Sequence, residues 1–151
     1  MNNPAVNAEC LDAPGGYEIS ADPARLDAAL IHRWLSQDAY WALGRSRARQ
    51  DRAIAGSLNF GAYRAGSGVQ VGYARVVTDF ATFAWLCDVY IDPAVRGQGL
   101  GTALVSAARD HLAPDGLRRI LLATNDAHGV YAKLGFTPLA TPEKWMALGH
   151  Q

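Results

Sequence analysis

The sequence has little cysteine, with only Cys10 and Cys87 among 151 residues. One lies in a polar N-terminal stretch and the other in an apolar segment, so their placement indicates neither a disulfide framework nor a metal site. No apolar run approaches the roughly 18–20 residues that span a bilayer, and no signal peptide is evident. We therefore expect a cytoplasmic protein that binds no metal and no membrane.

An excess of charge of one sign is also missing, because 14 lysines and arginines balance 14 aspartates and glutamates. A chain without a strong net field has no general electrostatic attraction for nucleic acid or for an anionic membrane. Arginines do cluster at positions 45, 47, 49 and 52, but Asp51 interrupts them, as on a solvated helix face. We predict no nucleic-acid partner.

Repeats and internal linkers are absent from the sequence, and half of its residues are apolar. A chain of this length can bury about two-thirds of its unfolded surface. We therefore predict one domain over residues 15–151. Residues 1–14 are small and polar with two prolines, and we expect them to form a flexible N-terminal segment.

Hydrophobic periodicity predicts a mixed α/β fold, with one sheet flanked by helices. Strands are expected over 17–20, 58–62, 69–78, 86–91, 118–124, 137–139 and 144–148. Helices are expected from Asp22-Pro23 to about Leu35, over 40–56 with a break near Gly44, over 100–112, and from about 126 to 135.

The stretch from Trp85 to His111 organises the chain: a buried strand, a glycine-rich turn and an amphipathic helix. Glycines let the backbone approach a ligand closely, and the free N–H groups of a helix N-terminus favour an anion. The turn Arg96–Gly101 lacks the lysine of a P-loop, and its G-x-G-x-G spacing differs from the dinucleotide fingerprint. A phosphate site with Arg96 as charged partner and a purely structural turn both remain open at this point.

A second segment supports the first interpretation. Arg96–Gly101 resembles the R/Q-x-x-G-x-G/A signature of the GNAT superfamily of acyl-CoA-dependent N-acyltransferases. Downstream, Asn125, Ala127, Tyr131 and Gly135-Phe136 resemble that family's second pattern. The two motifs have the family's order and spacing, and the resemblance extends over roughly residues 15–148. It implies the GNAT fold and acetyl-CoA as the cofactor.

The resemblance also implies roles for individual residues. The pyrophosphate of coenzyme A would bind the turn and helix start, namely Arg96, Gly97, Gln98, Gly99, Leu100, Gly101 and Thr102. The pantetheine arm would pair with the backbone of Val89 and Ile91, and the N–H of Val89 would polarise the thioester carbonyl. Tyr131 holds the position of the acid that protonates the leaving thiolate. Asn125 would hydrogen-bond the pantetheine arm or cap the helix that follows it.

No general base is evident. Simple strand alternation places Trp85, Cys87 and Val89 on one face, and Leu86, Asp88 and Tyr90 on the other. Relatives with a side-chain base carry Glu or His where this chain has Trp85 or Cys87. Asp88 would lie on the wrong face, so we interpret it as an anchor for neighbouring loops and expect a water relay to remove the proton.

The acceptor pocket is expected to involve the first helices and the central strand. Its candidate residues are Tyr40, Trp41, Arg45, Phe83 and Trp85. Arg45 would favour an acceptor that carries a carboxylate. The favoured function is transfer of an acetyl group to a small-molecule or amino-acid-like amine by a monomer or homodimer. The alternatives are a protein or peptide N-acetyltransferase and a non-catalytic acyl-CoA-binding module.

Overall fold

A six-stranded sheet runs through the molecule, and its strands follow one another in chain order. The computed structural model describes residues 10–149. The strands are β1 (Leu11–Ala13), β2 (Tyr17–Ser20), β3 (Leu58–Arg64), β4 (Gln70–Thr78), β5 (Phe83–Ile91) and β6 (Arg119–Leu121). Neighbouring strands are antiparallel from β1 to β5, and β6 is parallel to β5 because the chain crosses over through a helix. The mixed sheet predicted from the sequence is confirmed.

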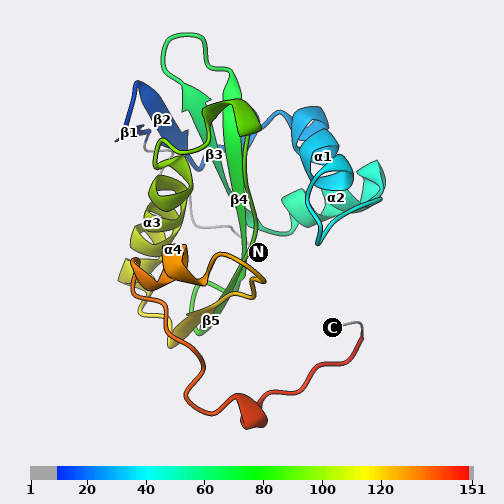
Figure 1. Cartoon of the computed structure of the whole chain (residues 1–151), viewed down its shortest axis with the longest axis vertical. Coiled ribbons are helices and arrows are strands. Elements are labelled where there is room, and N and C mark those ends of the chain that lie inside the picture. The colour runs from blue at the N-terminus through cyan, green and yellow to red at the C-terminus, as the bar shows by residue number, and fades with distance from the viewer. Residues whose placement is uncertain (1–9, 150–151) are drawn as a thin grey trace.

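Helices cover both faces of this sheet (Figure 1). One face carries α1 (Ala28–Gln37) and α2 (Arg47–Ala55), and the other carries α3 (Leu100–Leu112) and α4 (His128–Ala132). The core is accordingly divided in two. The larger part lies between the sheet and α3, whereas the smaller part packs α1 against Tyr73 and Tyr90.

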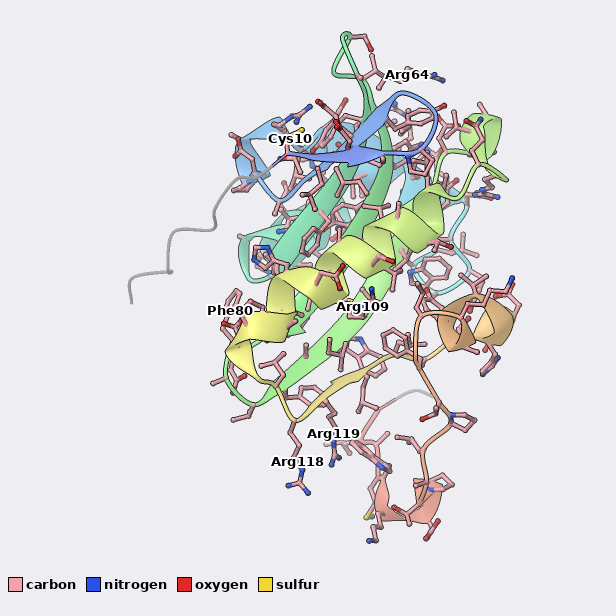
Figure 2. All side chains as sticks on the ribbon, turned by 90° about the vertical axis from the view of Figure 1, so that its left-hand side faces the viewer. Cys10, Arg64, Phe80, Arg109, Arg118 and Arg119 are labelled. Carbon is pink, nitrogen blue, oxygen red and sulfur yellow. The ribbon has the colours of Figure 1, made fainter. Side chains whose placement is uncertain are left out.

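Helix α3 forms because its apolar residues recur with the helical period and line one face. Leu100, Leu104, Val105, Ala108 and Leu112 are all buried there, each at most 3% exposed. Figure 2 shows α3 lying across the sheet, with Arg109 near its C-terminal half. Nη1 of Arg109 donates to the carbonyl of Leu134 at 3.2 Å and so connects α3 to the segment after α4.

The first two helices differ in their starts from those predicted. Residues Pro23–Arg25 form only a 3₁₀ turn, and α1 begins after Asp27, whose carboxylate accepts from the N–H of Leu30 at 3.0 Å. Residues 40–44 form turns, and α2 starts after Ser46, which caps it by accepting from the N–H of Arg49. Each helix therefore begins at its own side-chain cap.

The N-terminal segment that was expected to be flexible contains a strand. Residues 1–9 lie outside the described part of the chain, but Leu11–Ala13 pairs with Tyr17–Ser20 as an antiparallel hairpin. Gly15 and Gly16 both have positive φ, at 75° and 78°, and so allow the tight reversal between the two strands.

The C-terminal part departs most from the prediction. Strand β6 and helix α4 are shorter than expected, and the strands predicted over 137–139 and 144–148 are wrong, since that segment contains only a 3₁₀ turn at Pro142–Lys144. Pro138 and Pro142 have no N–H to donate to a ladder. The segment extends away from the sheet (Figure 1), and the ring of Trp145 lies 5.2 Å from the guanidinium of Arg119 in β6.

Candidate active site

Strands β5 and β6 separate after a short stretch of pairing. Phe83, Ala84 and Trp85 pair with Arg119, Ile120 and Leu121, and the ladder ends there although β5 continues to Ile91. On its other side, β5 stays paired with β4. The N–H of Asp92 donates to the carbonyl of Val71 at 2.9 Å. Because backbone groups alternate between the two sides of a strand, the N–H groups of Val89 and Ile91 point toward the split.

The glycine-rich turn follows directly at the end of β5. Gly97 and Gly99 have φ of 81° and 82°, a left-handed conformation that favours glycine, and a Cβ at either position would meet no atom within 4 Å. Packing inside the protein therefore does not require glycine at these two positions. The close approach of a ligand to their backbone would require it. The side chain of Leu100 is buried in the core, so only its backbone faces such a ligand.

The start of α3 offers hydrogen-bond donors. Among the described residues, no carbonyl accepts from the N–H groups of Leu100, Gly101 or Thr102, whereas the N–H of Ala103 donates to Gly99. Gly99 at the cap position supplies no side-chain oxygen. Unpaired N–H groups at the positive end of a thirteen-residue helix suit a phosphate. These residues fit the pyrophosphate of coenzyme A.

Arg96 makes contacts beside the split. Its Nε donates to the carbonyl of Ile91 at 2.9 Å, and its Nη2 lies 3.5 Å from Oδ2 of Asp38. The guanidinium carbon lies 5.1 Å from the centroid of the Tyr90 ring. About half of the Arg96 side chain is exposed. The structure thus places it next to the proposed phosphate site, but bound to β5 and Asp38.

A bulge in β5 overturns the simple alternation assumed for this strand. The register shifts between Tyr73 and Arg75 of β4, and Asp88 has φ of 51°, which a non-glycine residue seldom adopts. Asp88 therefore lies on the same face as Trp85 and Cys87. Val89 turns to the opposite face and packs against the α3 core. The predicted faces of Asp88, Val89 and Tyr90 were wrong, because one extra residue inverts the period after it. Tyr90 packs against α1, on the face opposite to Leu86.

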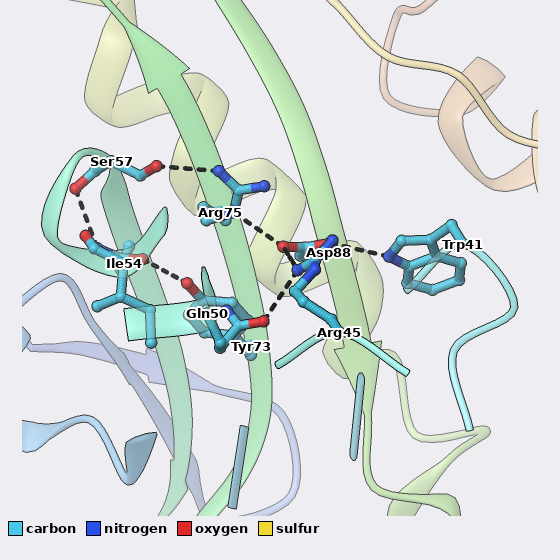
Figure 3. Close-up of polar contacts among 9 residues, drawn as sticks. Trp41, Arg45, Gln50, Ile54, Ser57, Tyr73, Arg75 and Asp88 are labelled. Carbon is cyan, nitrogen blue, oxygen red and sulfur yellow. Dashed lines mark hydrogen bonds and ion pairs between the residues drawn. The ribbon is translucent and has the colours of Figure 1, made fainter. Parts of the chain in front are cut away.

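Asp88 is the centre of a hydrogen-bonded cluster of four side chains, which we call the Asp88 cluster: Trp41, Arg45, Arg75 and Asp88 (Figure 3). Oδ2 accepts from Nη1 of Arg45 at 2.7 Å and from Nε of Arg75 at 2.8 Å, and Oδ1 accepts from Nε1 of Trp41 at 2.9 Å. Burial by itself would raise the pKa of Asp88, but the hydrogen bond from Arg45 and the charge of Arg75 outweigh it and hold the pKa below its usual range.

Neither side chain beside Asp88 is suited to accept a proton. Burial raises the pKa of Cys87 to about 11, so its thiol stays protonated at neutral pH. Trp85, which is 36% exposed, has no basic group. A carboxylate with a lowered pKa and three donors around it is likewise a weak base.

Tyr131 lies across the split on α4. Its ring packs edge to face against Phe136, with 5.8 Å between the centroids. Burial raises the pKa of the Tyr131 hydroxyl, and Tyr40 and Asp126 add to the shift. The hydroxyl therefore keeps its proton at neutral pH. Asn125 does not cap α4; Thr124 Oγ1 instead accepts from the N–H of Ala127 at 3.1 Å.

The residues predicted to bind the acceptor come together in part. Tyr40 and Trp41 pack edge to face with their centroids 4.9 Å apart, and Trp41 and Arg45 both bind Asp88. Trp85 lies on the same face of β5. Phe83 lies at the opposite end of that strand, where its carbonyl accepts from Thr78, and does not join them.

Arg75 was not predicted as part of the site. Its neighbours in β4, Ala74 and Val76, are fully buried on the opposite face of the sheet, so the sequence shows ordinary alternation and gives no signal of the ion pair. Its partner is evident only once β4 and β5 are aligned, because Arg75 is opposite Cys87 in the register.

Over residues 10–149, no helix is both long and apolar enough to cross a membrane. Nor do three or more His, Cys, Asp or Glu side chains gather in this range as a metal site requires.

Comparisons with known proteins agree with this geometry. The sequence model of the "Acetyltransferase (GNAT) family" matches residues 28–136. A candidate acetyltransferase of Gibberella zeae is 35% identical over 138 residues, which cover 79% of this chain and 77% of the relative. The crystal structure of a candidate GNAT acetyltransferase from Xanthomonas campestris pv. campestris superposes with a TM-score of 0.85 at 46% identity, covering 91% of this chain and 96% of the other.

A more distant structure, from Mycobacterium tuberculosis, was solved in complex with CoA. It matches with a TM-score of 0.67 at 21% identity, covering 80% of this chain and 72% of the other, which shows a shared fold. The family match covers most of the chain, and these relatives cover between 79% and 91% of it. The protein therefore belongs to the GNAT family of acetyltransferases.

Proposed function

We propose that the protein transfers an acetyl group from acetyl-CoA to the primary amine of a small molecule. The observation that carries this proposal is the split between β5 and β6. It opens beside the unpaired N–H groups of α3 and has Tyr131 on its far side. Acetyl-CoA supplies a thioester, whose carbonyl carbon accepts the amine.

The chain's own backbone supplies the binding groups for the nucleotide end. The N–H groups between Gly97 and Thr102 would hold the pyrophosphate, with the side chain of Arg96 free to turn from Ile91 toward it. The N–H groups of Val89 and Ile91, which point into the split, would pair with the pantetheine arm as an added strand. Asn125, in the loop after β6, would complete this contact from the opposite side.

Two groups would then act on the reacting atoms. The N–H of Val89 would polarise the thioester carbonyl as negative charge develops on its oxygen. Tyr131 would protonate the leaving sulfur, because its raised pKa keeps the proton in place until the thiolate forms. Since no side chain near Asp88 is a suitable base, water would remove the proton from the amine.

The test is a screen of primary amines for thiol release from acetyl-CoA, combined with calorimetric titration of coenzyme A. We expect coenzyme A to bind and thiol release to depend on an added small amine. Binding without release for any small amine or peptide would support the non-catalytic alternative and overturn the proposal. Release with peptides alone would make the protein a peptide N-acetyltransferase.

A further inference from the structure

The Asp88 cluster contains two positive charges and one negative charge. Arg45 and Arg75 bind the same oxygen of Asp88, at 2.7 and 2.8 Å. Their side chains are only 17% and 14% exposed, and that of Asp88 is 1% exposed. Removing charges from water is costly unless they are paired. The single carboxylate of Asp88 balances the charge of one arginine, so a further anion would stabilise the other.

Residues 10–149 do not supply that anion. Their other nearby carboxylates have partners of their own: Asp38 accepts from the hydroxyl of Tyr90, and Asp51 pairs with Arg47. Burial lowers the pKa of Arg75, and among the carboxylates of the described residues the charge of Asp88 alone raises it. The cluster therefore carries a net positive charge at neutral pH.

Hydrogen-bond donors also outnumber acceptors in this cluster. Arg45 gives one N–H to Gln50 Oε1 at 2.9 Å, and Arg75 gives one to Ser57 Oγ at 3.1 Å (Figure 3). Over residues 10–149, Nη2 of Arg75 and Nε of Arg45 have no acceptor, and the fully buried Gln50 keeps its Nε2 unpaired. A ligand that fits here is rich in acceptors and negatively charged, as a carboxylate is.

The position of the cluster limits the size of such a ligand. Asp88 directly precedes Val89, and consecutive Cα atoms are about 3.8 Å apart. The guanidinium groups that bind Asp88 thus lie close to the N–H proposed to polarise the thioester. Beside them the same sheet face carries Trp85 and Val77, which are opposite each other in the register and are 36% and 43% exposed. An apolar group would pack there.

We infer that the acceptor is an amino acid or a close analogue, whose carboxylate binds Arg45 and Arg75 a few bonds from the attacking amine. The inference rests on the proposed function and names its substrate class. The amine nitrogen bonds to the acetyl carbon while the carbon–sulfur bond breaks. Of the three protons on the ammonium form of the acceptor, one goes to the solvent before attack, one stays on the amide nitrogen and one is balanced by the proton that the sulfur receives, so that an N-acetylamino acid and coenzyme A leave. A protein N-terminus has an amide at the corresponding place, and a lysine side chain has methylene groups there; both lack the anion.

The first experiment compares matched acceptors. Leucine and phenylalanine are assayed against leucinamide and phenylalaninamide, with kcat/KM calculated for the free-amine form, because the amides have less basic amines. Charge-assisted hydrogen bonds predict a preference for the carboxylates of roughly 10- to 100-fold. Equal or higher kcat/KM for the amides would overturn the inference and leave the acetyltransferase proposal intact.

The second experiment measures the same preference in Arg75→Gln. We expect the ratio of carboxylate to amide kcat/KM to fall toward one, because only the carboxylate loses a partner. Arg47→Gln removes a charge from exposed α2, where Arg47 pairs with Asp51, and should leave the ratio unchanged. If both acceptors lose activity in parallel in Arg75→Gln, the arginine has a structural role and the inference is wrong.

These outcomes separate the inference from the proposed function. Failure of coenzyme A to bind, or binding without turnover of any amine, would contradict the proposed function. Turnover of neutral amines at the highest kcat/KM would contradict the inference alone. Preference for carboxylates in the wild type, lost in Arg75→Gln, would support both.

Discussion

The hydroxyl of Tyr40 accepts a hydrogen bond from the backbone N–H of Asn125, with 3.2 Å between the two atoms. Tyr40 lies in the turn between α1 and α2, and Asn125 follows β6, so this bond joins opposite sides of the split. The neighbouring Trp41 binds Asp88. The turn over residues 38–46 is thus attached on two sides, to the β5 bulge and to the loop before α4.

Loss of the Tyr40 hydroxyl should loosen this connection. In Tyr40→Phe the Asn125 amide loses its acceptor, and we expect its hydrogen exchange to become faster by about 5-fold or more, as for loss of a bond of about 1 kcal/mol. The measurement is amide exchange by NMR or mass spectrometry. Tyr63→Phe is the matched control, because the buried Tyr63 hydroxyl has no hydrogen-bond partner among residues 10–149. Unchanged exchange at Asn125 in Tyr40→Phe would show that the bond contributes nothing in solution.

Gly99→Val should block the proposed phosphate site. The new side chain would extend from a left-handed residue into the space beside the unpaired N–H groups of α3. We expect affinity for coenzyme A to fall by at least about 100-fold, since lost hydrogen bonds to a charged group are worth about 1.5–3 kcal/mol each. Calorimetry measures the affinity.

The control for this variant is Gly116→Val. Gly116 is also left-handed, at φ 65°, with no atom within 4 Å of a Cβ, but it follows α3 at its far end. Both variants therefore introduce the same backbone strain. Equal affinities for coenzyme A in the two proteins would place the pyrophosphate elsewhere.

Tyr131→Phe should lower kcat by roughly 10²–10⁴-fold, the usual contribution of an acid, with little change in the affinity for acetyl-CoA. The pH profile is a second readout. Because the Tyr131 pKa is raised, the protonated hydroxyl persists at higher pH, and the alkaline loss of kcat should occur above the ordinary tyrosine value of about 10. Wild-type kcat in the variant, with chemistry rate-limiting, would exclude Tyr131 as the acid.

Asp88→Asn should destabilise the fold at neutral pH by about 3 kcal/mol, because it leaves two guanidinium groups around a neutral amide. The folded pKa of Asp88 lies below its unfolded value of about 3.9, so the wild type gains this stability above that value and loses it as the pH falls through the folded pKa. Urea unfolding between pH 2 and 8 measures the difference. A difference independent of pH across this range would contradict the prediction.

The same variant tests whether Asp88 is a base. The bulge has turned its carboxylate toward the acceptor face, but three donors hold it there and lower its pKa. In the pH profile of kcat/KM, we expect the midpoint of the acid limb to stay unchanged in Asp88→Asn. The rate itself can fall, because the side chains that Asp88 holds lose their positions. Disappearance of that limb would identify Asp88 as the base.

Local patterns in the sequence predicted the parts of the fold that depend on local spacing. The apolar period of Leu100–Leu112 determines α3, and the glycines at 97 and 99 mark the turn before it. The two motifs also predict a cofactor site, since each lies within one short segment. The family resemblance supplied the order of the elements around them.

Features that depend on pairing between distant segments were not predictable in the same way. The bulge at Asp88 has no glycine to mark it, and its left-handed φ is held by contacts from Trp41, Arg45 and Arg75. The strands predicted near the C-terminus had suitable residues, but a strand also requires a neighbour, and residues 137–149 leave the sheet.

The order of the strands also has a consequence for how the chain folds. Each antiparallel neighbour from β3 to β5 is adjacent in sequence, whereas β6 reaches β5 only after the whole of α3. Closing that longer connection costs more chain entropy, and the few residue pairs between β5 and β6 offset little of this cost. We therefore expect β3–β5 to form in the folding transition state, and β6, which completes the split, to join afterwards.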